Sequence, residues 1–187
     1  LFRSGEWAYA WHPVIGEFSP AQARGFRAWL KAKYVEADAL RAAWDDPDAD
    51  FDTVEIPYEE RLRPTGVYPR PWSLFDPARE MRGIDYQRYH SEVVADAIAH
   101  FCGVAKDELA ALEREKVCGV FYGYHFVNLR IPYALQGSGH HALEPVLASP
   151  HVDFLCAPLN YQERQAGGYY LIIQRRAEEI HMRRREH

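Results

Sequence analysis

The sequence predicts an α/β fold with a parallel sheet, and three observations support this prediction. Two nearly continuous apolar runs, 117–122 and 152–157, are typical of strands covered on both faces. Amphipathic segments precede and separate these runs, and alternating helices and buried strands are typical of parallel sheets. The chain has 187 residues, of which 48% are hydrophobic. It is therefore long enough and apolar enough for about one domain with its own core.

The first predicted helix begins at Ser19, whose side chain can cap the helix, with Pro20 at the first helical position. Gln22 can reach back as the third residue of a capping box. Apolar residues then recur with a period of about 3.6 residues as far as Tyr34. A second, shorter helix is expected over 36–44.

A proline-rich stretch separates these two helices from the next one. Six of the twelve prolines fall between Pro47 and Pro77. Proline fits neither the interior of a helix nor a central strand, so this stretch is expected to be an ordered excursion or a mobile loop. The acidic residues within 36–60 indicate a solvated surface.

The third predicted helix is long and begins near Gly83. A short helix over 140–148 is expected between the two strands, although Pro145 limits where it can start. The inner face of the long helix is expected to hold Tyr86, Tyr89 or His90, Val93, Val94, Ala97, Phe101, Ala105 and Leu109.

Composition and charge exclude several classes of protein. The formal net charge of −5 argues against a general nucleic-acid binder, and Arg183–Arg185 stand among glutamates, as on a solvated helix. No apolar run is long enough to cross a membrane. His140 and His141 are neighbours on an expected helix and point in different directions, which argues against a metal site. Neither a metal nor an organic cofactor is implied.

The three cysteines, Cys102, Cys118 and Cys156, fit neither a zinc motif nor a closed set of disulfides. Free thiols are typical of a reducing compartment, which favours the cytoplasm. The first residues, Leu1 to Ser4, lack the layout of a signal peptide and give no targeting information.

Four segments together resemble glycoside hydrolase family 42, the β-galactosidase-like enzymes. They are Gly5-Glu6-Trp7; Phe18 to Gln22 running into Phe26-Arg27-Ala28-Trp29-Leu30, Lys33-Tyr34 and Ala39 to Trp44; Ile84 to Glu92; and the strand pair Gly119 to Tyr124 with Val152 to Pro158. The resemblance covers about residues 4–170. It implies a partial (β/α)8 barrel over 1–170, holding about strands four to six with their helices, while the N- and C-terminal strands are missing. Residues 171–187 are a charged, helix-like tail that does not match the family.

The resemblance also implies a reaction, the retaining hydrolysis of a β-galactoside or a similar β-glycoside by paired carboxylates. Glu6 matches the position of the catalytic acid/base, although Gly5 stands where the family usually has Asn. The second carboxylate, the nucleophile, cannot be identified in the sequence. Residues 171–174 lead into the charged tail rather than into a strand that ends in Glu. The isolated chain is therefore expected to be an inactive inner fragment.

Aromatic and polar side chains near the expected strand ends are candidates for binding the sugar. Aromatic rings can stack on the apolar faces of a sugar, and amide, hydroxyl and guanidinium groups can hydrogen-bond to its hydroxyl groups. Packing beneath the proline-rich stretch and ordinary loop capping are the alternative roles. The candidates are Trp7, Trp11, Tyr124, Asn160, Tyr161 and Arg164.

Two other functions stay open at this point. One is a catalytically inactive, carbohydrate-binding relative, and the other is a structural fragment without activity. In each case the expected partner is a carbohydrate or none, rather than a nucleic acid or a membrane. Exposed strand edges in a partial barrel also favour association into a homo-oligomer.

Overall fold

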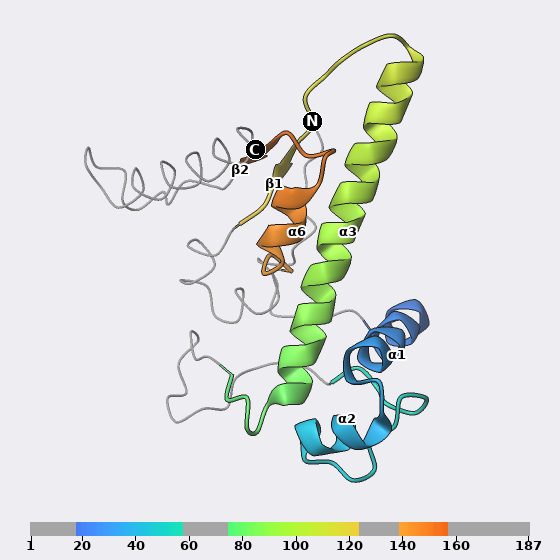
Figure 1. Ribbon diagram of the computed structural model, residues 1–187, viewed down its shortest axis with the longest axis vertical. Coiled ribbons are helices and arrows are strands. Elements are labelled where there is room, and N and C mark those ends of the chain that lie inside the picture. The colour runs from blue at the N-terminus through green and yellow to red at the C-terminus, as the bar shows by residue number, and fades with distance from the viewer. Residues whose placement is uncertain (1–17, 58–74, 124–138, 157–187) are drawn as a thin grey trace, which may run out of the picture.

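A computed structural model of the chain describes residues 18–57, 75–123 and 139–156. Figure 1 shows one long helix, α3, with two short helices beside its N-terminal end and a small strand-and-helix unit beside its C-terminal half. The elements in chain order are α1 (Pro20–Tyr34), α2 (Ala37–Trp44), α3 (Met81–Ala111), β1 (Gly119–Phe121), α6 (Leu143–Ala148) and β2 (Phe154–Cys156).

The two N-terminal helices form where the local sequence predicts them. The Ser19 hydroxyl accepts a hydrogen bond from the Gln22 backbone N–H at 3.2 Å, and Pro20 opens α1. This bond satisfies one of the amide groups that a helix leaves without a partner at its start. Helix α2 follows after Glu36 and ends at Asp45, which adopts the left-handed conformation.

The first half of α3 packs against α1 and α2 through aromatic rings. Phe26 of α1 is fully buried and lies 5.3 Å from Tyr86 and 5.4 Å from Tyr89 between ring centroids. Trp44 of α2 stacks on the same phenylalanine at 6.3 Å. Rings of this size supply much of the apolar area that holds small helical clusters together.

A fully buried carboxylate, that of Asp85 on α3, lies at the centre of this cluster. Its oxygens accept hydrogen bonds from the Tyr34 hydroxyl at 2.7 Å and from the Trp44 indole N–H at 2.8 Å. The Lys33 ammonium forms an ion pair with the same carboxylate. One side chain of α3 is therefore bonded to the C-terminal ends of both α1 and α2.

The second half of α3 covers the two strands, which pair in parallel. Gly119 is opposite Phe154 and Phe121 is opposite Cys156 in the register of β1 and β2. The adjacent, parallel arrangement predicted from the two apolar runs is thus confirmed. A second buried cluster joins α3, α6 and the strands; its members are Val94, Ala95, Ile98, Cys102, Val120, Tyr122, Val146 and Val152.

The predicted partial barrel is wrong. The described residues are mostly helical and hold only two strands, each three residues long. The apolar runs 117–122 and 152–157 overstate the strands, because Val117 is 74% exposed before β1 begins. Helices α1 and α2 pack on the first half of α3 and form their own core instead of covering a closed ring of strands.

The long predicted helix is confirmed, but part of its expected inner face is not. Phe101 is 39% exposed, whereas Ile98 and Cys102 are buried instead. Helix α3 spans about 46 Å at 1.5 Å per residue and contacts different partners along its length, so one periodic face cannot describe it.

We predict that Gly25→Ala destabilises the protein, although in a helix interior alanine is normally about 1 kcal/mol more favourable than glycine. An added Cβ at this position in α1 would lie 2.1 Å from the Tyr89 hydroxyl oxygen. Tyr89 is 6% exposed, so its ring has little room to move. Overpacking of this kind costs about 1–3 kcal/mol, which predicts a net loss in the free energy of unfolding measured by urea denaturation.

The matched control is the same substitution in a Tyr89→Phe background. Removing the hydroxyl leaves Cζ as the nearest atom, at 3.2 Å. The cost of Gly25→Ala should therefore shrink in this background. An equal cost in both backgrounds would contradict the packing of Tyr89 on α1.

Candidate functional site

The candidate site is the edge of the sheet at which β1 and β2 both end. Because the strands are parallel and Phe121 is opposite Cys156, the chain leaves both strands at the same edge. In parallel sheets this carboxyl edge is where binding residues usually lie. In sequence, Tyr124 follows β1 by three residues and Asn160 follows β2 by four.

Tyr122 fixes this edge to the segment that precedes α6. Its backbone N–H donates to the Cys156 carbonyl at 3.0 Å, which extends the pairing of the strands by one bond. Its hydroxyl donates to the Gly139 carbonyl at 3.3 Å and accepts from the Ala142 N–H at 3.1 Å. The ring is 1% exposed and stacks on His140 with 4.5 Å between centroids.

Glycine is required where this segment crosses α3. Gly139 has φ of +66°, and a Cβ there would lie 2.8 Å from Val94 Cγ2 and 3.2 Å from His90 Nε2. The next residues are held to the same helix, since the His141 N–H donates to the Ser91 hydroxyl at 3.4 Å. Helix α3 therefore sets the position of the sheet edge and of residues 139–142 together.

The electrostatics of this edge favour neutral groups. Burial raises the pKa of the Tyr122 hydroxyl well above its ordinary value, and the hydrogen bond from the Ala142 N–H opposes this only in part. The hydroxyl therefore stays protonated at neutral pH and serves as both donor and acceptor. Tyr122 and His140, which is fully buried, hold the edge in place but offer no surface to a substrate.

The sequence-predicted site residues lie outside the described residues. They are Glu6, Trp7, Trp11, Tyr124, Asn160, Tyr161 and Arg164. The structure brings together the ends of the strands that precede four of them, but it does not test their roles. The hydrogen bonds of Tyr122 and its stacking on His140 were not predicted; the available signal was a polar tyrosine at the end of an apolar strand.

The described ranges contain neither a candidate metal centre nor a candidate membrane span. In 18–57, 75–123 and 139–156, no three His, Cys, Asp or Glu side chains form a group that could hold a metal ion. No helix in these ranges is both long and apolar enough to cross a bilayer.

Comparison with protein-family models, curated proteins and solved structures found no match to the chain.

We predict that the protein loses stability above about pH 10 through Tyr122 and Tyr34. Burial raises the pKa of both hydroxyls, and the nearby Asp85 carboxylate raises that of Tyr34 further. The folded state then keeps protons that the unfolded chain releases near pH 10, so the stabilisation is complete below this pH and is lost as the pH rises. The buried Tyr122 contributes a slope of up to about 1.4 kcal/mol per pH unit, and the partly exposed Tyr34 contributes less because solvent screens it.

Guanidinium unfolding at several pH values from 8 to 11.5 measures this slope for the wild type and for Tyr122→Phe. The variant should be less stable at pH 8, by about 1 kcal/mol, because the Gly139 and Ala142 groups lose a partner. It should also lose less stability between pH 10 and 11.5 than the wild type does. Parallel curves for the two proteins would contradict the burial of a protonated Tyr122.

Proposed function

We propose that the protein binds β-glycosides and hydrolyses them with retention, acting on a β-galactoside or a similar sugar. The observation that carries this proposal is the parallel register that ends β1 and β2 at one edge. The residues expected to bind the sugar follow these strands in the chain: Tyr124 after β1, and Asn160, Tyr161 and Arg164 after β2.

These residue types suit recognition of a sugar. Hydroxyl, amide and guanidinium groups can bond to the hydroxyl groups of a sugar, which are both donors and acceptors. Tyr122 and the segment 139–142 support this role indirectly, because they hold the ends of both strands through buried hydrogen bonds. A rigid edge lowers the entropy lost when flanking side chains bind a ligand.

Glu6 is the proposed general acid and base. Glycoside cleavage needs a carboxylic acid that protonates the leaving oxygen, and the same group then activates the water that releases the sugar. Trp7 and Trp11 follow Glu6 closely in sequence. Apolar neighbours of this kind raise the pKa of a carboxyl group, which keeps a proton available near neutral pH.

A second candidate function is sugar binding without turnover. Retaining hydrolysis needs a second carboxylate as nucleophile, and the run 171–174 leads into a charged segment rather than to a glutamate at a strand end. If this carboxylate is missing from the functional protein, binding can survive although hydrolysis is lost.

The test uses the protein expressed from its complete reading frame, with aryl β-galactosides as substrates. We predict that Glu6→Gln lowers kcat by at least about 100-fold with a 4-nitrophenyl substrate. The loss should be smaller with a 2,4-dinitrophenyl substrate, because this better leaving group needs less help from an acid. Asn160→Ala should raise KM by up to about tenfold through the loss of one hydrogen bond.

The matched control is Glu36→Gln, an exposed residue at the start of α2, which should change neither constant. Sugar binding without turnover in the wild type would favour the second candidate. A protein that neither binds nor cleaves β-glycosides would contradict both candidates. A loss in Glu6→Gln that is equal for the two leaving groups would exclude Glu6 as the acid.

A further inference from the structure

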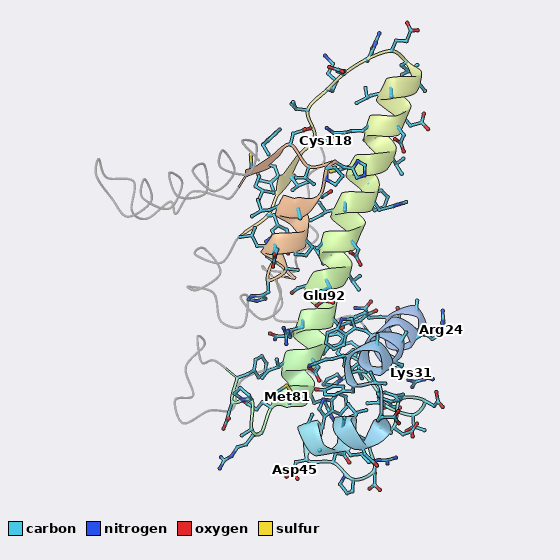
Figure 2. The ribbon with its side chains drawn as sticks, viewed as in Figure 1. Arg24, Lys31, Asp45, Met81, Glu92 and Cys118 are labelled. Carbon is cyan, nitrogen blue, oxygen red and sulfur yellow. The ribbon has the colours of Figure 1, made fainter. Side chains whose placement is uncertain are left out.

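Two cysteines meet where the second half of α3 crosses the start of β1. Cys102 of α3 is 3% exposed, and Cys118, the residue before β1, is partly exposed. The Asp153 carboxylate bonds both to the Cys118 N–H and to Lys106, one helical turn after Cys102, which places Cys118 against this part of α3. Cys102 belongs to the apolar cluster that joins α3 to the strands, and Cys118 packs against this cluster. Figure 2 shows Cys118 between the strands and the upper part of α3.

The position of Cys118 is fixed by Asp153 from the start of β2. The Cys118 N–H donates to the Asp153 carboxylate at 2.7 Å, and the Asp153 N–H donates to the Cys118 carbonyl at 2.8 Å. The Lys106 ammonium bonds to the same carboxylate at 2.8–2.9 Å. Lys106 lies one helical turn after Cys102, so Asp153 joins the residues around Cys118 to this turn of α3.

An open groove lies beside this cluster, and Val117, the neighbour of the partly exposed Cys118, lies on its wall. The groove has a volume of about 960 Å³, and Lys106, Val117 and Asp153 lie on its walls. Arg114 and Lys116 line it as well, so three cationic side chains face a ligand that enters. The carboxylates of Glu113, Glu115 and Asp153 share the same walls, so the groove suits a small peptide thiol that carries both carboxylate and ammonium groups.

We propose that Cys102 and Cys118 form a reversible disulfide by exchange with a low-molecular-weight disulfide of the glutathione class. The partly exposed Cys118 thiolate attacks one sulfur of the small disulfide, which releases one small thiolate and leaves a mixed disulfide on Cys118. The Cys102 thiolate then attacks the Cys118 sulfur and displaces the second small thiolate. Two protein thiols are oxidised, one small disulfide is reduced to two thiols, and the two protein protons pass to the released thiolates.

The order of the two steps follows from burial. Cys102 is closed off in the apolar cluster, and burial raises the pKa of its thiol above the ordinary value. A protonated, enclosed thiol is a poor first nucleophile, but it can resolve a mixed disulfide that forms beside it. This inference is independent of the proposed glycosidase function, because it uses none of the residues assigned to that reaction.

The experiment treats the folded chain with oxidised glutathione and follows the product by intact-mass and peptide mass spectrometry under non-reducing conditions. The wild type and the Cys156→Ser control should both lose two hydrogen atoms and yield a Cys102–Cys118 cross-linked peptide. Cys102→Ser should instead stop at one glutathione adduct on Cys118, because the resolving thiol is missing. Cys118→Ser should gain no adduct on Cys102, and dithiothreitol should reverse every modification.

Three results would overturn the proposal. These are an adduct on Cys102 in Cys118→Ser while that variant keeps the circular dichroism spectrum of the wild type, a cross-link that involves Cys156, or a wild type that carries only a stable adduct. A second measurement needs no variant: iodoacetamide should alkylate Cys118 of the folded wild type at least about tenfold faster than Cys102. Equal rates in the folded protein would also overturn the assigned order.

Discussion

The buried carboxylate of Asp85 is the constraint on which the arrangement of the helices depends. A carboxylate without solvent costs several kcal/mol unless its lone pairs are satisfied, and here the donors come from two other helices. The Tyr34 hydroxyl and the Trp44 indole both bond to the same oxygen, so small shifts of α1 or α2 would leave the charge exposed to apolar neighbours. Aromatic packing supplies the attraction between these helices, and the polar bonds select one arrangement of them.

Helix α3 connects the cluster around Asp85 to the strands. Its first turns hold Asp85, and its middle part contributes Val94, Ile98 and Cys102 to the core beneath β1 and β2. The same helix contacts the segment that begins at Gly139. The sheet edge that is proposed to bind a sugar is therefore positioned by one continuous element, and so is the contact between the thiols of Cys102 and Cys118.

The sequence predicts features that depend on residues close in the chain well, and contacts between residues far apart in the chain poorly. The Ser19 cap, the two N-terminal helices and the parallel pairing all follow from residues close in the chain or from a clear apolar pattern. The barrel does not, because apolar runs do not say how many residues a strand will pair. The role of Asp85 was not predicted either, since its donors lie 41 to 52 positions away in the sequence. The edge that precedes Tyr124 and Asn160 was predicted, whereas the residues themselves lie beyond the described ranges.

The free energy of unfolding of Asp85→Asn tests the central role of this carboxylate most directly. Asparagine keeps the shape but loses the charge, so the Lys33 ammonium loses its ion-pair partner, and an amide N–H₂ group replaces an acceptor. We predict a loss of about 1.5–3 kcal/mol in urea denaturation, the range for hydrogen bonds to charged groups. Asp96→Asn on the exposed face of the same helix should change stability by less than about 0.5 kcal/mol. Equal stability of the two variants would contradict the account.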